Sequence, residues 1–182
     1  IAVLAANPGM DWQDAYRLAW KKHPLPIILV GTTSGTGSEV TPTAVITDPD
    51  GKKRGISHPD LYADISFADP KYTYSLPRSV TISTGLDALA HASESFLSPL
   101  CDSVSSAFAV QAIPVLSRHL YALSRGDDLT SQMHAELYDA SLWAGLMLNA
   151  VGTAYPHPFG YVLTEDFGIP HGRACTTFLP SL

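Results

Sequence analysis

The feature that most constrains the fold of this chain is a change of sequence pattern near residue 75. Upstream of it, short apolar runs suited to buried strands alternate with turns and loops. The expected strands are residues 27–30, 44–47 and 65–68, and a short helix over residues 11–22, capped by Asp11, precedes them. This pattern of short strands, turns and one short helix predicts that residues 1–75 belong to an α/β domain.

Downstream of residue 76 the spacing of apolar residues is helical, and no clear strand pattern is present as far as Cys175. The predicted helices are residues 78–97, 103–123, 129–151 and 155–167. We therefore expect an all-α portion over residues 76–182. The chain lacks an initial Met and both of its ends lie at apolar runs, so we expect an internal piece of a longer protein, with the helical portion incomplete at its C-terminus.

The composition argues against several classes of protein. With 46% hydrophobic and 15% charged residues, the 182-residue chain can bury a sizeable core. A net charge of -6 and the lack of a Lys/Arg run argue against nucleic acid or an anionic membrane as a partner. No apolar stretch reaches the roughly 18 residues of a membrane span. The two cysteines are too few for a disulfide framework and lack metal-motif spacing, so a reducing, cytoplasmic setting is expected.

A loop rich in glycine and small hydroxyl side chains, residues 31–39, follows the first expected strand. Glycines let a backbone approach a phosphate closely, and Thr32, Thr33 and Thr36 can donate hydroxyl hydrogen bonds to one. The loop lacks the lysine of a P-loop and is not G-x-G-x-x-G, so an ordinary flexible loop is an equally good interpretation. Lys53 could bring an ammonium group near a phosphate, but a solvated surface lysine is the more common case.

Asp87 and His91 are four residues apart in a stretch of good helix formers, so both side chains should lie on one helix face and could share a divalent metal. His157 and His171 are separated by a helical segment whose closing turn could bring both imidazoles to one point. Such a mixed set suits iron, zinc or a similar first-row ion better than magnesium or calcium. Core or surface histidines are the alternative. The four other histidines are predicted to lie on the surface: His23, His58, His119 and His134.

Motifs in the same order along almost the whole chain resemble those of the iron-containing (group III) alcohol dehydrogenases. They are Thr32-Thr-Ser-Gly-Thr-Gly-Ser-Glu-Val-Thr41, Ile46-Thr-Asp48, Lys53-Arg-Gly-Ile, Thr84-Gly-Leu-Asp-Ala-Leu-Ala-His91, and His157-Pro-Phe-Gly160 with Gly168-Ile-Pro-His-Gly172. The resemblance implies a dehydroquinate-synthase-like architecture. Residues 1–75 would be the C-terminal part of a Rossmann-like dinucleotide-binding α/β domain, and residues 76–182 a helical metal-binding domain.

The same resemblance implies roles for individual residues. The metal ligands would be Asp87, His91, His157 and His171, holding Fe(2+), with Zn(2+) as an open alternative. The residues facing NAD or NADP would be Thr32, Thr33, Thr36, Lys53 and Leu86. The G-G-G-S segment that holds the pyrophosphate in this family would lie upstream of Ile1. In part of the family a histidine follows the third ligand by four residues; Tyr161 stands there in this chain and is a candidate donor to the site.

The function implied by the resemblance is NAD(P)-linked interconversion of a small alcohol and its aldehyde, with hydride transfer at the nicotinamide and a divalent metal polarising the substrate oxygen. A homo-oligomer is expected for the full-length protein, and the 182 residues alone are expected to be inactive. Two alternatives stay open: a dehydroquinate-synthase-like lyase that also uses NAD and a metal, and a non-catalytic helical metal-binding module. The sequence leaves the substrate open.

Overall fold

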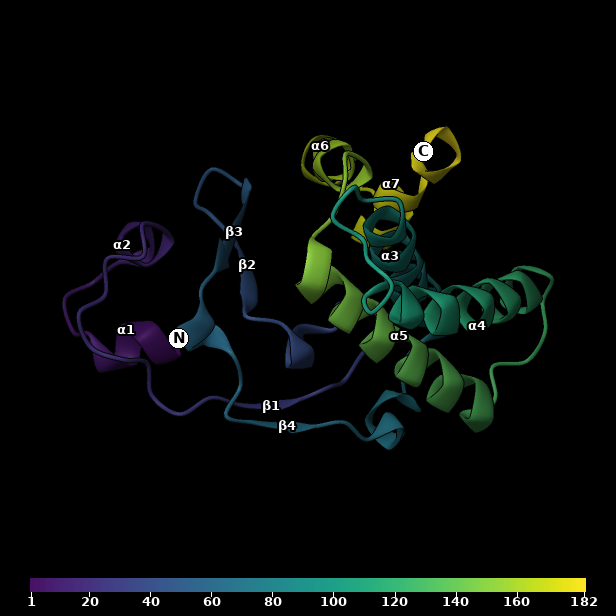
Figure 1. Ribbon diagram of the computed structural model, residues 1–182, viewed down its shortest axis with the longest axis horizontal. Coiled ribbons are helices and arrows are strands. Elements are labelled where there is room, and N and C mark those ends of the chain that lie inside the picture. Colours follow the sequence, from purple (N-terminus) through teal and green to yellow (C-terminus); the bar gives the residue numbers. More distant parts are fainter.

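The computed structural model describes all of residues 1–182, and its first part contains two separate pairs of strands (Figure 1). Strands β1 (Ile28–Val30) and β4 (Ile65–Phe67) run parallel to each other. Strands β2 (Thr43–Thr47) and β3 (Lys53–Ser57) form an antiparallel hairpin. The three strands expected from the sequence are confirmed, each to within one residue at either end.

The sequence does not predict β3, because Lys53 and Gly55 are poor strand formers. The turn that precedes it decides its conformation. Asp48 Oδ1 accepts a hydrogen bond from the backbone N–H of Lys52 at 2.8 Å, and Gly51 adopts a φ of +79°, which glycine tolerates best. The closed turn aligns residues 53–57 with β2, so pairing overrides local propensity.

The first part also contains two short helices, α1 (Ala2–Ala6) and α2 (Trp12–Tyr16). Asp11 caps α2 as predicted, since its side chain accepts from two backbone N–H groups of the first turn. The predicted extension of this helix to residue 22 is wrong. Leu18 adopts a φ of +56°, which ends the helix, and the buried Asn7 amide hydrogen-bonds to the backbone that follows.

The second part of the chain is helical, as predicted (Figure 1). Its helices are α3 (Arg78–Phe96), α4 (Ser106–Ser124), α5 (Ser131–Val151), α6 (Pro156–Phe167) and α7 (His171–Thr176). Helices α3, α4 and α5 pack against one another, and α7 packs on both α3 and α6. The buried core is made of small and branched residues: Ala88, Ala92, Ala112, Leu116, Leu120, Leu123, Leu137, Ala140 and Ala144. Every helix is too short or too polar to span a bilayer.

Helix α7 is missing from the sequence prediction because Gly168 and Pro170 indicate a turn. The turn exists, with Gly168 at a φ of +66° closing α6, but Pro170 stands just before a new helix rather than in a longer loop. His171 is therefore the first residue of α7. This position fixes the direction in which its side chain leaves the backbone.

Two of the four histidines predicted to lie on the surface are buried, so the prediction is wrong for them. His119 Nε2 on α4 lies 2.6 Å from Glu136 Oε2 on α5. His134 Nδ1 on α5 lies 3.3 Å from Thr73 Oγ1. A buried imidazole is stable when a polar partner satisfies it, and these partners are 17 and 61 residues away in sequence. Local spacing could not reveal them.

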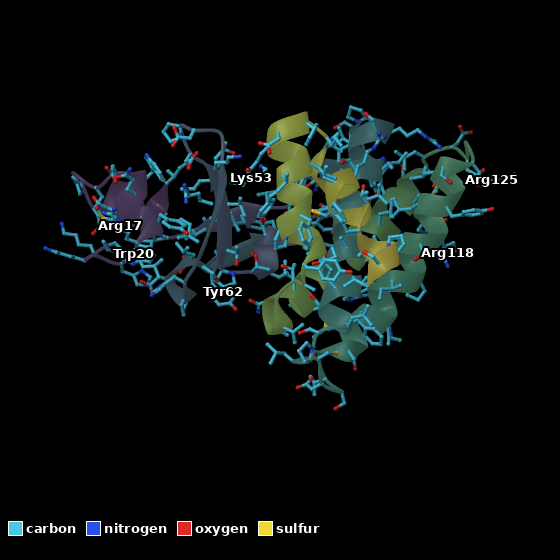
Figure 2. The ribbon with its side chains drawn as sticks, turned by 90° about the horizontal axis from the view of Figure 1, so that it is seen from above. Arg17, Trp20, Lys53, Tyr62, Arg118 and Arg125 are labelled. Carbon is cyan, nitrogen blue, oxygen red and sulfur yellow. The ribbon has the colours of Figure 1, made fainter.

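The strand-containing part meets the helices along α5 and α6. Tyr62 Oη donates to Asn149 Oδ1 at 2.8 Å, and the backbone N–H of Lys53 donates to Glu165 Oε1 at 2.7 Å. Figure 2 shows Lys53 and Tyr62 at this junction, whereas Arg118 and Arg125 mark the opposite end of the helical part. The hairpin of β2 and β3 is therefore held directly against the helical part.

Substituting Leu137 with alanine is expected to lower the free energy of unfolding by about 2–5 kcal/mol, because its fully buried side chain would leave a cavity between α3, α4 and α5. Urea unfolding followed by circular dichroism measures the change. Val110→Ala on the exposed face of α4 is the control, with an expected change below about 0.5 kcal/mol. Equal effects of the two substitutions would contradict the described core.

Candidate metal centre

Helix α3 supplies the first two side chains of the centre. Asp87 and His91 are buried, with 4% and 6% of their surfaces exposed, and they lie on one face of the helix, as their spacing predicts. Asp87 Oδ1 is 4.0 Å from His91 Nε2. The carboxylate and the imidazole therefore approach the same point without a direct hydrogen bond.

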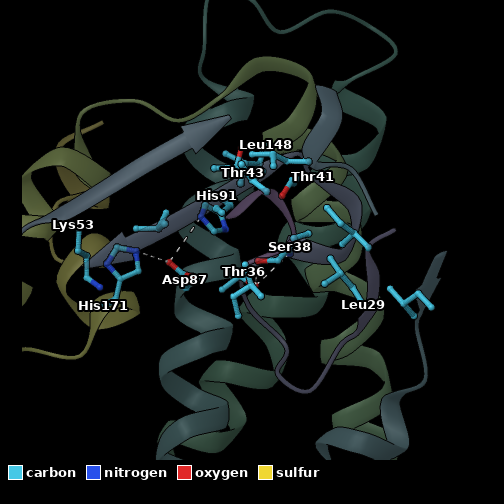
Figure 3. Close-up of a pocket in the computed structure, with 18 of the residues that line it drawn as sticks. Leu29, Thr36, Ser38, Thr41, Thr43, Lys53, Asp87, His91, Leu148 and His171 are labelled. Atoms are coloured by element: carbon cyan, nitrogen blue, oxygen red, sulfur yellow. Dashed lines mark hydrogen bonds and ion pairs between the residues drawn. The ribbon is translucent and has the colours of Figure 1, made fainter. Parts of the chain in front are cut away.

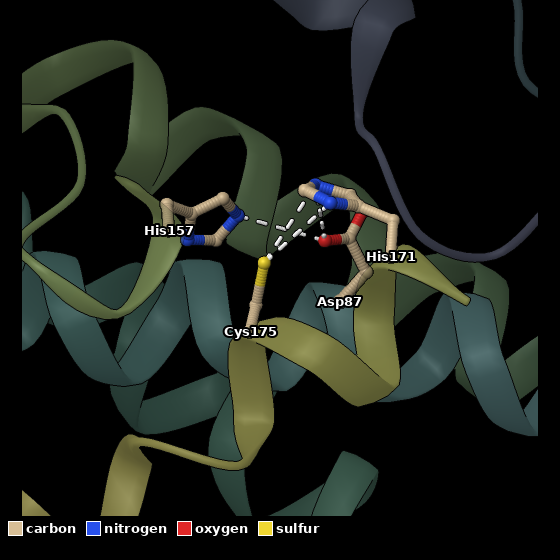
Figure 4. A group of neighbouring side chains, drawn as sticks. All are labelled: Asp87, His157, His171 and Cys175. Carbon is tan, nitrogen blue, oxygen red and sulfur yellow. Dashed lines mark hydrogen bonds and ion pairs between the residues drawn. The ribbon is translucent and has the colours of Figure 1, made fainter. Parts of the chain in front are cut away.

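Helices α6 and α7 supply the other two imidazoles. His157 lies in the first turn of α6 and His171 begins α7, and the Nε2 atom of each is 3.5 Å from Asp87 Oδ1 (Figure 4). The His91 ring stacks on the His157 ring, with centroids 4.6 Å apart and an interplanar angle of 14°. The structure thus brings the four predicted ligands together around one carboxylate oxygen.

Cys175 also lies at this point, although the cysteine spacing in the sequence indicates no metal motif. Its Sγ is 3.6 Å from His171 Nδ1 and 3.7 Å from His171 Nε2. The sulfur and the donor atoms of Asp87, His157 and His171 all lie within 4.8 Å of one another (Figure 4). Cys175 follows His171 by one helical turn, so this neighbour could be found from sequence only by first predicting α7.

Buried polar atoms without hydrogen-bond partners show that this centre is suited to a metal. Asp87 Oδ1 and His157 Nε2 are such atoms, and each unsatisfied group costs roughly 1–3 kcal/mol unless something binds it. Donor atoms about 2.0–2.3 Å from one tetrahedral ion stand roughly 3.3–3.8 Å apart. The two 3.5 Å separations at Asp87 Oδ1 match that spacing. The residues present therefore fit a divalent first-row metal.

The charges of the centre are strongly coupled. Burial alone would raise the pKa of the Asp87 carboxyl, but His91, His157 and His171 outweigh burial and hold that pKa at about 2. Burial alone would lower the pKa of His157, but the neighbouring Asp87, Cys175 and Glu94 groups raise it to about 12. Only a ring nitrogen without a proton can bind a metal, so metal binding at His157 requires Nε2 to be unprotonated.

The pKa values of the other two imidazoles shift in the opposite direction from that of His157. Burial lowers the pKa of His91 and of His171, and the attraction of Asp87 only partly offsets it. Neutral imidazole is the form that binds metals, so both rings favour the ligating state.

Tyr161 stacks on the His171 ring at a centroid distance of 5.3 Å and an angle of 21°. Its contact with the centre is this ring stacking.

Glu94 is a further residue of the centre that the sequence analysis does not single out. It is fully buried on α3, and its Oε1 lies 2.6 Å from His157 Nδ1. The signal in the sequence was its position seven residues after Asp87, which places it two turns along the same helix face. Its partner is 63 residues away, so the contact itself is not visible from spacing.

A cavity of about 1000 Å³ joins the metal centre to the strand-containing part (Figure 3). Asp87, His91, His157, Tyr161 and His171 line it on the helical side. The strand-containing part contributes Thr36, Ser38 and Lys53 to its lining, and Lys53 lies beside His171 (Figure 3). Two of the predicted cofactor-binding residues, Thr36 and Lys53, therefore share a cavity with all four predicted metal ligands.

The other predicted cofactor-binding residues lie elsewhere. Thr32 and Thr33 line a smaller neighbouring cavity of about 150 Å³, which also includes Thr36. Leu86 lines neither cavity and packs instead against the helical core. Thr36 Oγ1 accepts hydrogen bonds from both the backbone N–H and the hydroxyl of Ser38, so its own proton is free to be donated to a ligand.

The glycine-rich loop is anchored on α5. Gly37 has a φ of +58°, and a Cβ there would come within 2.5 Å of the Gly145 Cα, so the two backbones touch directly. Two residues further on, Glu39 Oε1 accepts a 2.7 Å hydrogen bond from Tyr138 Oη of the same helix. These contacts hold the loop beside the cavity and oppose the interpretation as an ordinary flexible loop.

Comparison with known proteins agrees with the sequence motifs. The family profile described as "Fe-containing alcohol dehydrogenase family, C-terminal" matches residues 81–182, and the one described as "Iron-containing alcohol dehydrogenase" matches residues 1–70. Long-chain-alcohol dehydrogenase 1 of Geobacillus thermodenitrificans is 40% identical over 161 residues, covering 88% of this chain and 40% of the relative. The 1-propanol dehydrogenase PduQ of Citrobacter freundii is 36% identical over 182 residues, covering 94% and 48%.

Solved structures give the same result. An iron-containing alcohol dehydrogenase from Thermotoga maritima superposes with a TM-score of 0.89 at 39% identity, covering 98% of this chain and 48% of that one. A sulfoacetaldehyde reductase from Bifidobacterium kashiwanohense, solved in complex with NAD+, superposes with a TM-score of 0.80 at 32% identity, covering 97% and 45%. The fold is therefore that of the iron-containing alcohol dehydrogenases.

The chain belongs to the iron-containing alcohol dehydrogenase family, and the resemblance inferred from its motifs is confirmed. It spans about half the length of the curated relatives that it matches.

Proposed function

We propose that the complete protein carrying this chain is a metal-dependent, NAD(P)-linked alcohol dehydrogenase that interconverts a small alcohol and its aldehyde. Residues 76–182 are the metal-binding part, and residues 1–75 are the C-terminal part of a Rossmann-like dinucleotide-binding domain. The named activities of the relatives, on 1-propanol and on long-chain alcohols, support an alcohol as the substrate. The NAD+ complex of the sulfoacetaldehyde reductase supports a nicotinamide cofactor.

The observation that carries the proposal is the shared cavity. On its helical wall, Asp87 and three histidines offer one oxygen and three nitrogen donors, a set that fits Fe(2+) and Zn(2+) alike. From the strand-containing part, Thr36 and Lys53 offer a hydroxyl and an ammonium group to an anionic cofactor in the same cavity. A dehydrogenase needs both functions to face each other across one space, because the carbon that loses hydride must meet the nicotinamide.

The chain's own residues would act by binding and orienting. Asp87, His91, His157 and His171 would hold the metal, which when bound supplies Lewis-acid polarisation of the substrate oxygen. Thr36 would donate its free hydroxyl proton to the cofactor, and Lys53 would neutralise phosphate charge from the β3 side. Tyr161 covers one face of the His171 ring and so limits access of water to that ligand from the cavity.

Spectrophotometric assay of the complete, anaerobically purified protein tests this function. We expect NADH or NADPH to form when a primary alcohol is added to protein loaded with Fe(2+) or Zn(2+), and to be consumed with the matching aldehyde. A panel of alcohols of increasing chain length, starting at 1-propanol, would define the substrate range. Lack of turnover in both directions, with either cofactor and either metal, would reject the proposal.

A further inference from the structure

We infer that Glu94 is a positioning residue of the metal centre: it fixes the ring orientation and tautomer of His157 so that Nε2 faces the metal. The inference rests on the metal centre proposed above and concerns a residue outside the ligand set. It follows from the contacts of one fully buried carboxylate.

The first contact is between Glu94 Oε1 and His157 Nδ1, at 2.6 Å. A neutral imidazole carries one N–H and one lone pair, and the hydrogen bond made by one nitrogen decides which role the other takes. Because Nδ1 donates to Glu94, the lone pair of the metal-binding form must lie on Nε2. That atom is buried without a hydrogen-bond partner and lies 3.5 Å from Asp87 Oδ1. A carboxylate behind a histidine ligand also raises its basicity toward the metal.

The second contact holds Glu94 itself in place. Its Oε2 accepts a 2.9 Å hydrogen bond from the backbone N–H of Ala154, in the connection between α5 and α6. With one oxygen on this backbone and the other on His157 Nδ1, both oxygens of the carboxylate are held in place. The adjacent Ser95 Oγ donates to the Gly152 carbonyl of the same connection at 2.6 Å. Ser95 therefore tethers the connection without a hydrogen bond to any histidine.

Comparing Glu94 with Ser95 distinguishes two explanations of why Glu94 is buried. A buried carboxylate destabilises the fold unless it is hydrogen-bonded and paired, so its burial requires a stabilising contact. If the contact were only the tether to the connection, Ser95 would perform the same task. If the contact that counts is His157, only Glu94 affects the metal. Glu94 also lies on the same face of α3 as Asp87 and His91, so one helix would provide two ligands and the support for a third.

Zinc affinity of the complete protein tests the inference, measured by competition with a chromophoric chelator on wild type, Glu94→Ala, Glu94→Gln and Ser95→Ala. We expect Glu94→Ala to weaken Zn(2+) binding by about 10- to 100-fold, the usual effect of removing a carboxylate behind a histidine ligand. Glu94→Gln, which keeps an acceptor for Nδ1–H but loses the charge, should lie between Glu94→Ala and wild type. Ser95→Ala should bind as wild type does.

A spectroscopic readout accompanies the affinities. In the Co(2+)-loaded protein, the paramagnetically shifted Nδ1–H proton of His157 should exchange slowly with solvent in wild type and Ser95→Ala, and rapidly in Glu94→Ala. Wild type that fails to bind Zn(2+) would reject the metal centre itself. Wild type that binds, with Glu94→Ala of equal affinity, would overturn the role of Glu94 alone. An equal loss in Ser95→Ala would also overturn it, in favour of the tether. If Glu94→Ala does not fold, Glu94→Gln decides by the same comparison.

Discussion

Replacing Asp87 with alanine is expected to abolish metal retention by the complete protein. Asp87 is the one carboxylate of the proposed ligand set, and the Nε2 atoms of His157 and His171 both lie 3.5 Å from its Oδ1. Its removal would leave three imidazole donors and no carboxylate in the ligand set to offset the charge of a divalent ion. Elemental analysis after desalting would measure the loss, which we expect to be complete.

The same result is expected for His157→Ala and His171→Ala, since each removes one donor from the set. Asp166→Ala is a suitable control, because this carboxylate is half-exposed and pairs with Lys52 outside the centre. The control should keep the metal content of wild type. Full metal content in the Asp87 or either histidine variant would rule out the four-ligand centre.

Gly172→Ala is expected to produce the second large effect, although glycine carries no functional group. A Cβ at this position would collide with the Ser83 carbonyl oxygen and would lie 2.8 Å from the Asp87 backbone nitrogen. Both obstacles are backbone atoms of α3, so α7 would have to move away from α3. We expect a loss of roughly 1–3 kcal/mol in the free energy of unfolding, the usual cost of overpacking. His171, the preceding residue, would move with α7, so metal affinity should fall by more than about tenfold.

Thermal unfolding with and without Zn(2+) separates these two consequences of the Gly172 substitution. Gly55→Ala on β3 is the matched control, because a Cβ there meets no atom within 4 Å and the backbone does not need glycine. The control should leave both the melting temperature and its shift on adding Zn(2+) unchanged. A Gly172→Ala protein as stable and as strongly stabilised by Zn(2+) as wild type would contradict the close contact between α3 and α7.

The parts of the fold that depend on local sequence were predictable. The capping of α2 by Asp11, the strands β1, β2 and β4, and the four long helices follow from side-chain properties within a few residues. Two of the missed features, β3 and the burial of His134, have a different cause. Strand β3 forms because a turn pairs it with β2, and the burial of His134 depends on Thr73 from another segment. In both cases pairing with another segment decides the outcome.

The sequence by itself determined the one face of α3 that contributes to the centre. Asp87, His91 and Glu94 lie on the same face of α3 because the helical repeat puts residues four and seven apart in line. Only the tertiary structure decided which side chains of other helices contact this face. His157, His171 and Cys175 reach it because α7 packs closely on α3 and α6, where Gly172 and Gly160 leave no side chain between the backbones. Such contacts join residues some 60 or more positions apart, and only close packing of whole helices can specify them.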